Sequence, residues 1–156
     1  MIQKSTEQII NKYSDTVYKL AYAQMRNKSD ADDIYQEVFI RFIRKKPRFE
    51  SEEHAKAWFI RVTVNCCKKY WASSWFKRNI ITNDLPEETT SELIELSLEL
   101  DKLPEKYRYV IHLFYYEDMS IEKISKVLNR KPSTVRTQLT RGRRLLKDIL
   151  EEASNA

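Results

Sequence analysis

The stretch from Arg130 to Lys147, near the carboxyl end, contains seven cations and no acidic residue. At helical spacing its polar residues fall on one face, opposite an apolar row that begins at Val135. Arginine can pair bidentately with guanine, threonine can contact the methyl group of thymine, and further cations neutralise phosphates. An ordinary solvated face mixes both signs of charge, so this pattern favours contact with duplex DNA. The residues of the face are Ser133, Arg136, Thr137, Thr140, Arg141 and Arg144.

A second group of basic residues lies between positions 61 and 78, and aromatic residues are mixed with it. Its members at helical spacing and the aromatic residues that follow are Arg61, Asn65, Lys68 and Lys69, then Trp71, Trp75 and Phe76. Such mixtures are typical of surfaces that bind single-stranded nucleic acid, because rings stack on bases and cations hold the backbone. The alternative is that the tryptophans belong to the core, which we expect for Trp58.

A third set of residues shares the helical face opposite Ile34 and mixes charges with one isoleucine. The set is Asp33, Gln36, Glu37, Ile40, Arg41 and Arg44. An isoleucine among charges suggests a protein contact that would bury it. Taken alone the signal is weak, since single exposed apolar residues are common.

The sequence offers no constellation for catalysis. It lacks a glycine-rich phosphate loop, a metal-ligand set and a nucleophile–base spacing, so we predict no enzymatic activity, no cofactor and no metal. Cys66 and Cys67 are neighbours, a poor arrangement for a structural disulfide. We expect them to fill space in a helix, with a redox-sensing pair as the alternative. Together with His54 and His112 they supply too few ligands for a metal site.

Charge is distributed in three blocks along the 156 residues. Residues 1–78 carry a net +7 and residues 104–156 a net +4, whereas residues 79–103 carry −6, and the whole chain carries +5. Basic blocks suit a polyanion, and an acidic connector repels one. No apolar run approaches the roughly 20 residues of a membrane span, and the first residues lack the apolar core of a signal peptide. We therefore expect a cytoplasmic protein without membrane insertion.

Long helices must position these residues, because the chain has one glycine and four prolines. Periodicity predicts a first helix over about 5–26. The second should start at Ser29 as N-cap, end near Arg44 before Pro47, and bury Ile34, Val38, Phe42, Tyr35, Phe39 and Ile43. Ser51 signals the start of a third helix. That helix should reach the low seventies and bury Trp58, Val62, Cys66 and Tyr70.

Residues 79–91 have no helical period and are predicted to be a linker. A second domain should follow from Leu93, with a helix that opens near Pro104 and buries Tyr107, Val110, Ile111 and Phe114. Ser120 as cap, Asn129 at a turn and Pro132 at a helix start predict a helix-turn-helix. We expect the preceding helix to approach Gly142 closely.

Three segments resemble the sigma-70 family of bacterial sigma factors. Asp32 to Phe39 is similar to its region 2.2 signature, Trp58 to Asn65 to regions 2.3 and 2.4, and Leu103 through Arg144 to region 4. The short linker resembles the extracytoplasmic-function (ECF) group. The resemblance implies an all-α fold of two small helical domains. Residues 1–78 would form region 2, 79–91 the linker and 92–156 region 4.

The resemblance also implies a promoter-specificity factor that binds core RNA polymerase and recognises −10 and −35 elements. The surface for the polymerase β′ coiled coil would comprise Asp33, Gln36, Glu37, Ile40 and Arg41. The −10 surface for melted DNA would comprise Arg61, Asn65, Lys68, Lys69, Trp71 and Trp75, with the loop from Arg48 to His54. The −35 surface for duplex would comprise Lys131, Ser133, Thr134, Arg136, Thr137, Thr140, Arg141 and Arg144. The polymerase β flap and an anti-sigma factor are further implied partners.

Two residues depart from the family pattern at the predicted turn. Arg130 stands where a buried aliphatic residue is usual, and Lys131 where a capping Ser or Thr is common. Both cations are therefore further candidates for phosphate contact. A free-standing helix-turn-helix regulator is the alternative function, but it leaves the segment from Asp32 to Phe39 unexplained.

Overall fold

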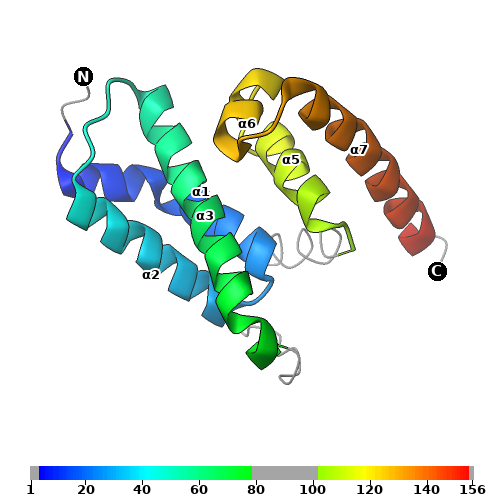
Figure 1. Ribbon diagram of the computed structural model, residues 1–156, viewed down its shortest axis with the longest axis horizontal. Helices are drawn as coiled ribbons and strands as arrows, with labels where there is room; N and C mark the ends of the chain where they lie inside the picture. Colours follow the sequence, from blue (N-terminus) through cyan, green and yellow to red (C-terminus); the bar gives the residue numbers. More distant parts are fainter. Residues whose placement is uncertain (1–3, 79–101, 155–156) are drawn as a thin grey trace. The chain divides into compact units, whose positions relative to one another are not determined.

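The computed structural model describes residues 4–78 and 102–154, with side chains for 4–72 and 102–152, and every element in them is an α-helix (Figure 1). This confirms the predicted all-α class. Backbone contacts divide the chain into two units, Met1–Glu88 and Thr89–Ala156. The predicted linker and the expected start of the second domain at Leu93 lie outside the described residues, so their bounds stay predictions.

The first unit is a bundle of three helices, α1 (Thr6–Met25), α2 (Lys28–Lys45) and α3 (Glu52–Arg78), each packed against the other two. Its centre is the fully buried ring of Phe59 on α3. The ring centroids of Tyr13 and Phe42 lie 5.0 and 5.2 Å from that of Phe59. Further rings in contact with Phe59 are those of Phe39, Phe49 and Trp58. Aromatic packing from three helices and the α2–α3 loop thus fixes the bundle.

The second helix begins earlier than predicted, because Asn27 and not Ser29 is its N-cap. The Asn27 Oδ1 accepts from the Asp30 backbone N–H at 2.8 Å, and its Nδ2 donates to the Asp30 carboxylate at 2.7 Å. Arg26 already ends α1 in the left-handed conformation, so the extended Asn27 can open α2 at once. The start of α3 is as predicted, since the Ser51 hydroxyl accepts from the His54 backbone N–H at 3.0 Å.

One predicted core position of this unit is exposed, and four are only half-buried. The Ile43 side chain is 51% exposed. The half-buried residues are Tyr35, Val62, Tyr70 and Trp58, the last at the edge of the aromatic cluster. The buried row of α3 lies one residue on from the predicted one and runs through Phe59, Thr63 and Cys67. Periodicity identifies an apolar side of a helix, but the position of the neighbouring helices decides which edge of that side is covered.

Several helix ends use a left-handed residue other than glycine. The four non-glycine residues with positive φ among the described residues are Arg26, Lys46, Asp118 and Asn129. Arg26 and Lys46 end α1 and α2, and the backbone N–H of each donates to the carbonyl four residues earlier. Asn129 ends α6 as predicted.

The second unit contains α5 (Glu105–Tyr115), α6 (Ile121–Leu128) and α7 (Pro132–Ser154), and both shorter helices pack against α7. Ser120 caps α6 through a 3.2 Å hydrogen bond from the Lys123 backbone N–H, as predicted. Pro132 is the first residue of α7. The helix-turn-helix of α6 and α7 is therefore present.

Gly142 lies where α7 meets α5, not where it meets the immediately preceding helix. A Cβ placed there would lie 3.2 Å from Ile111 Cγ1 and 3.3 Å from Tyr107 Cβ. The expected close approach is thus made by α5, two helices earlier in the chain. A larger residue would push α7 away from α5, which makes this glycine a packing residue.

Candidate nucleic-acid interface

One face of α7 is polar, cationic and fully open. All eight residues predicted for the −35 surface are exposed: Lys131, Ser133, Thr134, Arg136, Thr137, Thr140, Arg141 and Arg144. The Thr137 hydroxyl donates to the Ser133 carbonyl and the Thr140 hydroxyl to the Arg136 carbonyl, each at 3.0 Å. Because these protons are engaged within the helix, the two threonines offer a methyl group and an acceptor oxygen outward.

Within the described part of the chain, no ion pair joins the arginines of this face, Arg136, Arg141 and Arg144, to an acidic residue. Farther along α7, Lys147 forms an ion pair with Glu151 at 3.9 Å. The three guanidinium groups are therefore available to an external anion. A shallow groove of about 260 Å³ separates the start of α5 from this part of α7. It is lined by Lys106, Tyr107, Ser133, Thr134, Thr137, Gln138 and Arg141.

The two cations of the turn before α7 lie in different environments. Lys131 is exposed, as a phosphate contact requires. Arg130 is half-buried, and its Nη1 donates to the Lys106 carbonyl at 3.1 Å and to Gln138 Oε1 at 2.8 Å. The phosphate contact left open for Arg130 is therefore not favoured, because its donor group is used inside the unit.

On α3 the structure brings together most of the residues predicted to bind single strands. Arg61, Asn65, Lys68 and Lys69 are exposed along one side of the helix. Trp71 is half-buried, and the Arg26 guanidinium carbon lies 6.0 Å from its ring centroid, a cation–π contact. The side chain of Trp75 lies outside the described side chains, although its backbone belongs to α3.

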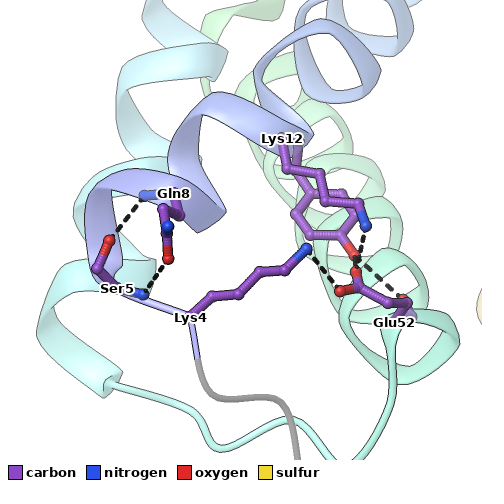
Figure 2. A network of polar contacts seen from close by, with 6 residues as sticks. Lys4, Ser5, Gln8, Lys12 and Glu52 are labelled. Atoms are coloured by element: carbon purple, nitrogen blue, oxygen red, sulfur yellow. Dashed lines mark hydrogen bonds and ion pairs between the residues drawn. The ribbon is translucent and has the colours of Figure 1, made fainter.

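The loop before α3 is held by a polar cluster that sequence reasoning missed (Figure 2). The Glu52 carboxylate accepts from Lys4 at 2.8 Å, Lys12 at 2.7 Å and the Tyr13 hydroxyl at 2.6 Å. Hydrogen bonds from Lys12, Lys4 and Tyr13 lower the pKa of Glu52 to about 2, and burial followed by the bond to Glu52 raises the pKa of Tyr13. The carboxylate therefore stabilises the fold above its ordinary pKa of 4.5, and this contribution is lost as pH falls toward 2.

Within the loop itself, Phe49 is buried in the aromatic cluster, and the Glu50 backbone N–H donates to His54 Nδ1 at 3.2 Å. Because Nδ1 accepts this bond, it carries no proton in this arrangement. The loop is thus anchored in its middle by the core and at its end by α3. Sequence spacing alone gives no signal of the Glu52 cluster, since its partners lie on or just before α1.

The face of α2 predicted for a protein contact is arranged around an ion pair. Asp33, Gln36 and Ile40 are exposed, whereas Glu37 and Arg41 are partly covered by each other, with Arg41 Nε donating to Glu37 at 2.9 Å. Ile40 is 40% exposed, and Ile43 one turn later is 51% exposed. The misassigned Ile43 therefore extends the apolar part of this face.

A second apolar surface was also missed. An open groove of about 450 Å³ lies between the end of α5 and the second half of α7, lined by Tyr115, Arg143, Leu146, Lys147, Leu150 and Glu151. Leu146 belongs to the predicted apolar row that begins at Val135, and its four-residue spacing to Leu150 could have indicated that the apolar surface widens here.

The two thiols are unlike redox sensors. Cys66 and Cys67 are both free and buried, and burial raises the pKa of Cys66. Reactive cysteines are exposed and have lowered pKa values, so filling space is the better description of this pair. None of the described helices is long and apolar enough to cross a membrane.

Comparison with known proteins agrees with this arrangement. Residues 9–77 match the family model for Sigma-70 region 2, and residues 93–146 match that for Sigma-70, region 4. The ECF RNA polymerase sigma factor SigW of Bacillus subtilis is 30% identical over 96% of this chain and 91% of its own length. SigE of Mycolicibacterium smegmatis, also an ECF sigma factor, is 30% identical over 97% of this chain, which spans 63% of SigE.

A solved structure shares the fold. The sigma factor RpoE of Bartonella quintana, in complex with the anti-sigma factor NepR, aligns with a TM-score of 0.76 and 17% identity over 93% of this chain and 96% of RpoE. The free-standing regulator considered above has no need of a region 2 bundle. By its two matched regions and its close full-length relative, the chain belongs to the sigma-70 family of RNA polymerase sigma factors, in the ECF group.

Proposed function

We propose that this ECF sigma factor directs RNA polymerase to its promoters with three separate surfaces, one on each of α2, α3 and α7. Residues 1–78 act as region 2, residues 79–91 as linker and residues 92–156 as region 4. The observation that carries the proposal is the exposed face of α7, whose arginines make no ion pair within the described residues.

On α7, Arg136 and Arg141 read base edges of the −35 duplex, and Lys131 and Arg144 hold phosphates. Ser133, Thr134, Thr137 and Thr140 supply short polar and methyl contacts. A long cationic helix that follows a short helix and a tight turn is suited to the major groove. The Thr137 and Thr140 hydroxyls, already bonded to their own helix, leave their methyl groups for thymine.

On α3, Asn65 contacts an unstacked base of the −10 element, and Arg61, Lys68 and Lys69 hold its backbone. Trp71 and Trp75 provide stacking surfaces. The loop from Arg48 to His54 closes over the captured strand and is held in place by Phe49 and Glu52. Bases caught out of the stack offset the cost of strand opening, a few kcal/mol for each base.

On α2, the polar face around Glu37 and Ile40 binds the coiled coil of the polymerase β′ subunit. The adjacent exposed Ile40 and Ile43 provide an apolar centre, and Asp33, Gln36, Glu37 and Arg41 surround it. This arrangement, apolar within a polar rim, is common at protein–protein interfaces.

The chain itself performs no catalysis and works in the cytoplasm, where the polymerase supplies all the chemistry. The polymerase β flap is a second contact, and an anti-sigma factor is a regulatory partner. The RpoE–NepR complex supports such a partner, because RpoE shares this fold.

Transcription reconstituted from core polymerase, the full chain and a pool of genomic promoter fragments tests the proposal. Specific run-off products should appear only when the chain is present. Glu37→Lys should weaken binding to core polymerase and reduce these products. Loss of the Glu37–Arg41 ion pair costs only about 0.3–0.5 kcal/mol of stability, so the fold should persist.

Glu7→Lys is the matched control, because Glu7 is an exposed acid in the first turn of α1, outside all three surfaces. It should leave core binding unchanged. Parental affinity of Glu37→Lys for core polymerase would refute the assignment of α2, and absence of specific products with the parent would refute the function as a whole.

A further inference from the structure

Arg130 is hydrogen-bonded to all three described helices of the second unit. Its backbone N–H donates to the Ser125 carbonyl of α6 at 2.9 Å, and its own carbonyl accepts a short hydrogen bond from the Ser125 hydroxyl. Its guanidinium Nη1 donates to the Lys106 carbonyl of α5 at 3.1 Å and to Gln138 Oε1 of α7 at 2.8 Å. A single turn residue therefore connects α5, α6 and α7.

The environment of Arg130 differs from that of the neighbouring Lys131. Arg130 is half-buried, and burial lowers its pKa below the ordinary value, while the group stays cationic. Lys131 is exposed. A planar guanidinium holds its donors in a fixed geometry, so it can serve two acceptors on different helices at once. An ammonium group or an aliphatic side chain cannot reproduce that connection.

Gln138, the partner on α7, borders the proposed −35 surface. Gln138 follows Thr137 directly and precedes Arg141 by one turn, and all three line the groove between α5 and α7. A hydrogen bond to Gln138 from a residue also bonded to α5 restrains the rotation of α7 about its axis. This rotation decides where the arginine side chains of the exposed face point.

We propose that Arg130 is a positioning residue for duplex recognition. By joining Gln138 to the Lys106 carbonyl, it sets the orientation in which α7 presents Arg136 and Arg141 to base edges. Its own charge is not used on phosphate. The inference rests on the proposed role of α7 as the reader of the −35 duplex.

The test uses holoenzyme assembled from core polymerase and the full chain. The specific probe is a duplex enriched from a randomised library by the parental holoenzyme, and the reference is a scrambled duplex of the same composition. Affinity for both is measured at several salt concentrations. The variants are Arg130→Leu, Arg130→Lys and Gln138→Leu, with Lys131→Ala as the matched neighbouring cation.

Arg130→Leu should reduce the preference for the selected duplex about tenfold, the scale of one good base contact. It should leave the salt dependence of affinity as in the parent. Lys131→Ala should do the opposite, lowering the salt slope by about one while preserving the preference. Arg130→Lys keeps the positive charge but lacks the planar guanidinium that serves two acceptors, so it should lose most of the preference. Gln138→Leu keeps the guanidinium and should lose preference as Arg130→Leu does.

Two results would overturn the inference. A lower salt slope for Arg130→Leu, restored by Arg130→Lys, would make Arg130 a phosphate contact. A lower melting temperature with full preference in both Arg130→Leu and Gln138→Leu would leave it a merely structural residue. If the proposed role of α7 were itself wrong, the result would differ from both of these. Either no duplex would be enriched from the library, or Arg136→Ala would retain the full preference.

Discussion

The two cationic helices, α3 and α7, are supported in opposite ways. Behind the exposed side of α3 stands an aromatic cluster around Phe59, to which α1, α2 and the α2–α3 loop all contribute rings. Behind α7 stands the single helix α5, and Gly142 lets Ile111 and Tyr107 of that helix approach closely. The surface that we propose for the −10 element is thus a composite of several segments, whereas the one that we propose for the −35 element is one helix face. A composite surface can enclose a flexible strand, and a single helix face can enter a groove.

Phe59→Ala should remove the aromatic cluster that packs behind α3, and it is the substitution for which we expect the largest destabilisation. Truncating a fully buried phenylalanine costs about 3–5 kcal/mol, because it leaves a cavity where five rings met. The first unit should lose its fold, and α5, α6 and α7 should keep theirs. Hydrogen exchange resolved along the chain measures both outcomes. Phe59→Leu, which leaves a smaller cavity, should cost less. Loss of protection in α7 as well would show that the two units unfold together.

The division of labour itself is tested by a crossed pair of substitutions. Arg136→Ala should impair recognition of the upstream duplex element, and a pre-melted downstream bubble should not restore it. Asn65→Ala should leave upstream duplex binding intact and impair capture of the non-template strand. Each loss should be about 1–3 kcal/mol, the worth of one base contact or one stacked base. Footprinting and permanganate reactivity on duplex and bubble templates report these effects, and identical defects would end the distinction between the surfaces.

The close approach behind α7 is probed by Gly142→Val. Even a Cβ at this position would lie 3.2 Å from Ile111, so two further methyl groups must displace α5. We expect a destabilisation of about 1–3 kcal/mol, confined to the second unit and measured by thermal unfolding. Leu145→Val, on an exposed part of the same helix, should change stability by less than about 0.5 kcal/mol. If the two variants were equally stable, α5 would be able to shift without a measurable loss in the free energy of unfolding.

The smallest effect concerns the start of α2. Asn27→Ala removes the cap and should cost the first unit about 1 kcal/mol, because the Asp30 backbone N–H loses its acceptor. Ser29→Ala should hardly change the free energy of unfolding, because Ser29 is a residue of α2 and not its cap, and its side chain is exposed. Denaturant unfolding distinguishes the two. If Ser29→Ala were the more destabilising of the two, Ser29 would be the N-cap, as the sequence had predicted.

Sequence spacing was a good guide wherever one helix carries the information. The face from Ser133 to Arg144, the cap Ser120 and the turn at Asn129 could all be predicted, because each depends on neighbours within about one turn. It failed where a distant partner decides. Arg130 bonds to α5 and Glu52 to α1, and Ile43 is exposed because none of the described helices covers its edge of α2. Periodicity states which residues share a face, but not which other element meets it.

The left-handed ends of α1 and α2 bear on how long the unbound protein persists. Arg26 and Lys46 adopt a conformation that costs an L-residue about 1–2 kcal/mol, at sites where glycine would be relaxed. A cost of this size changes the ratio of folded to unfolded molecules about fivefold or more. Unfolded copies are the ones that cellular proteases remove. By raising the unfolded fraction, these two turns therefore increase the share of unbound copies that proteases can attack.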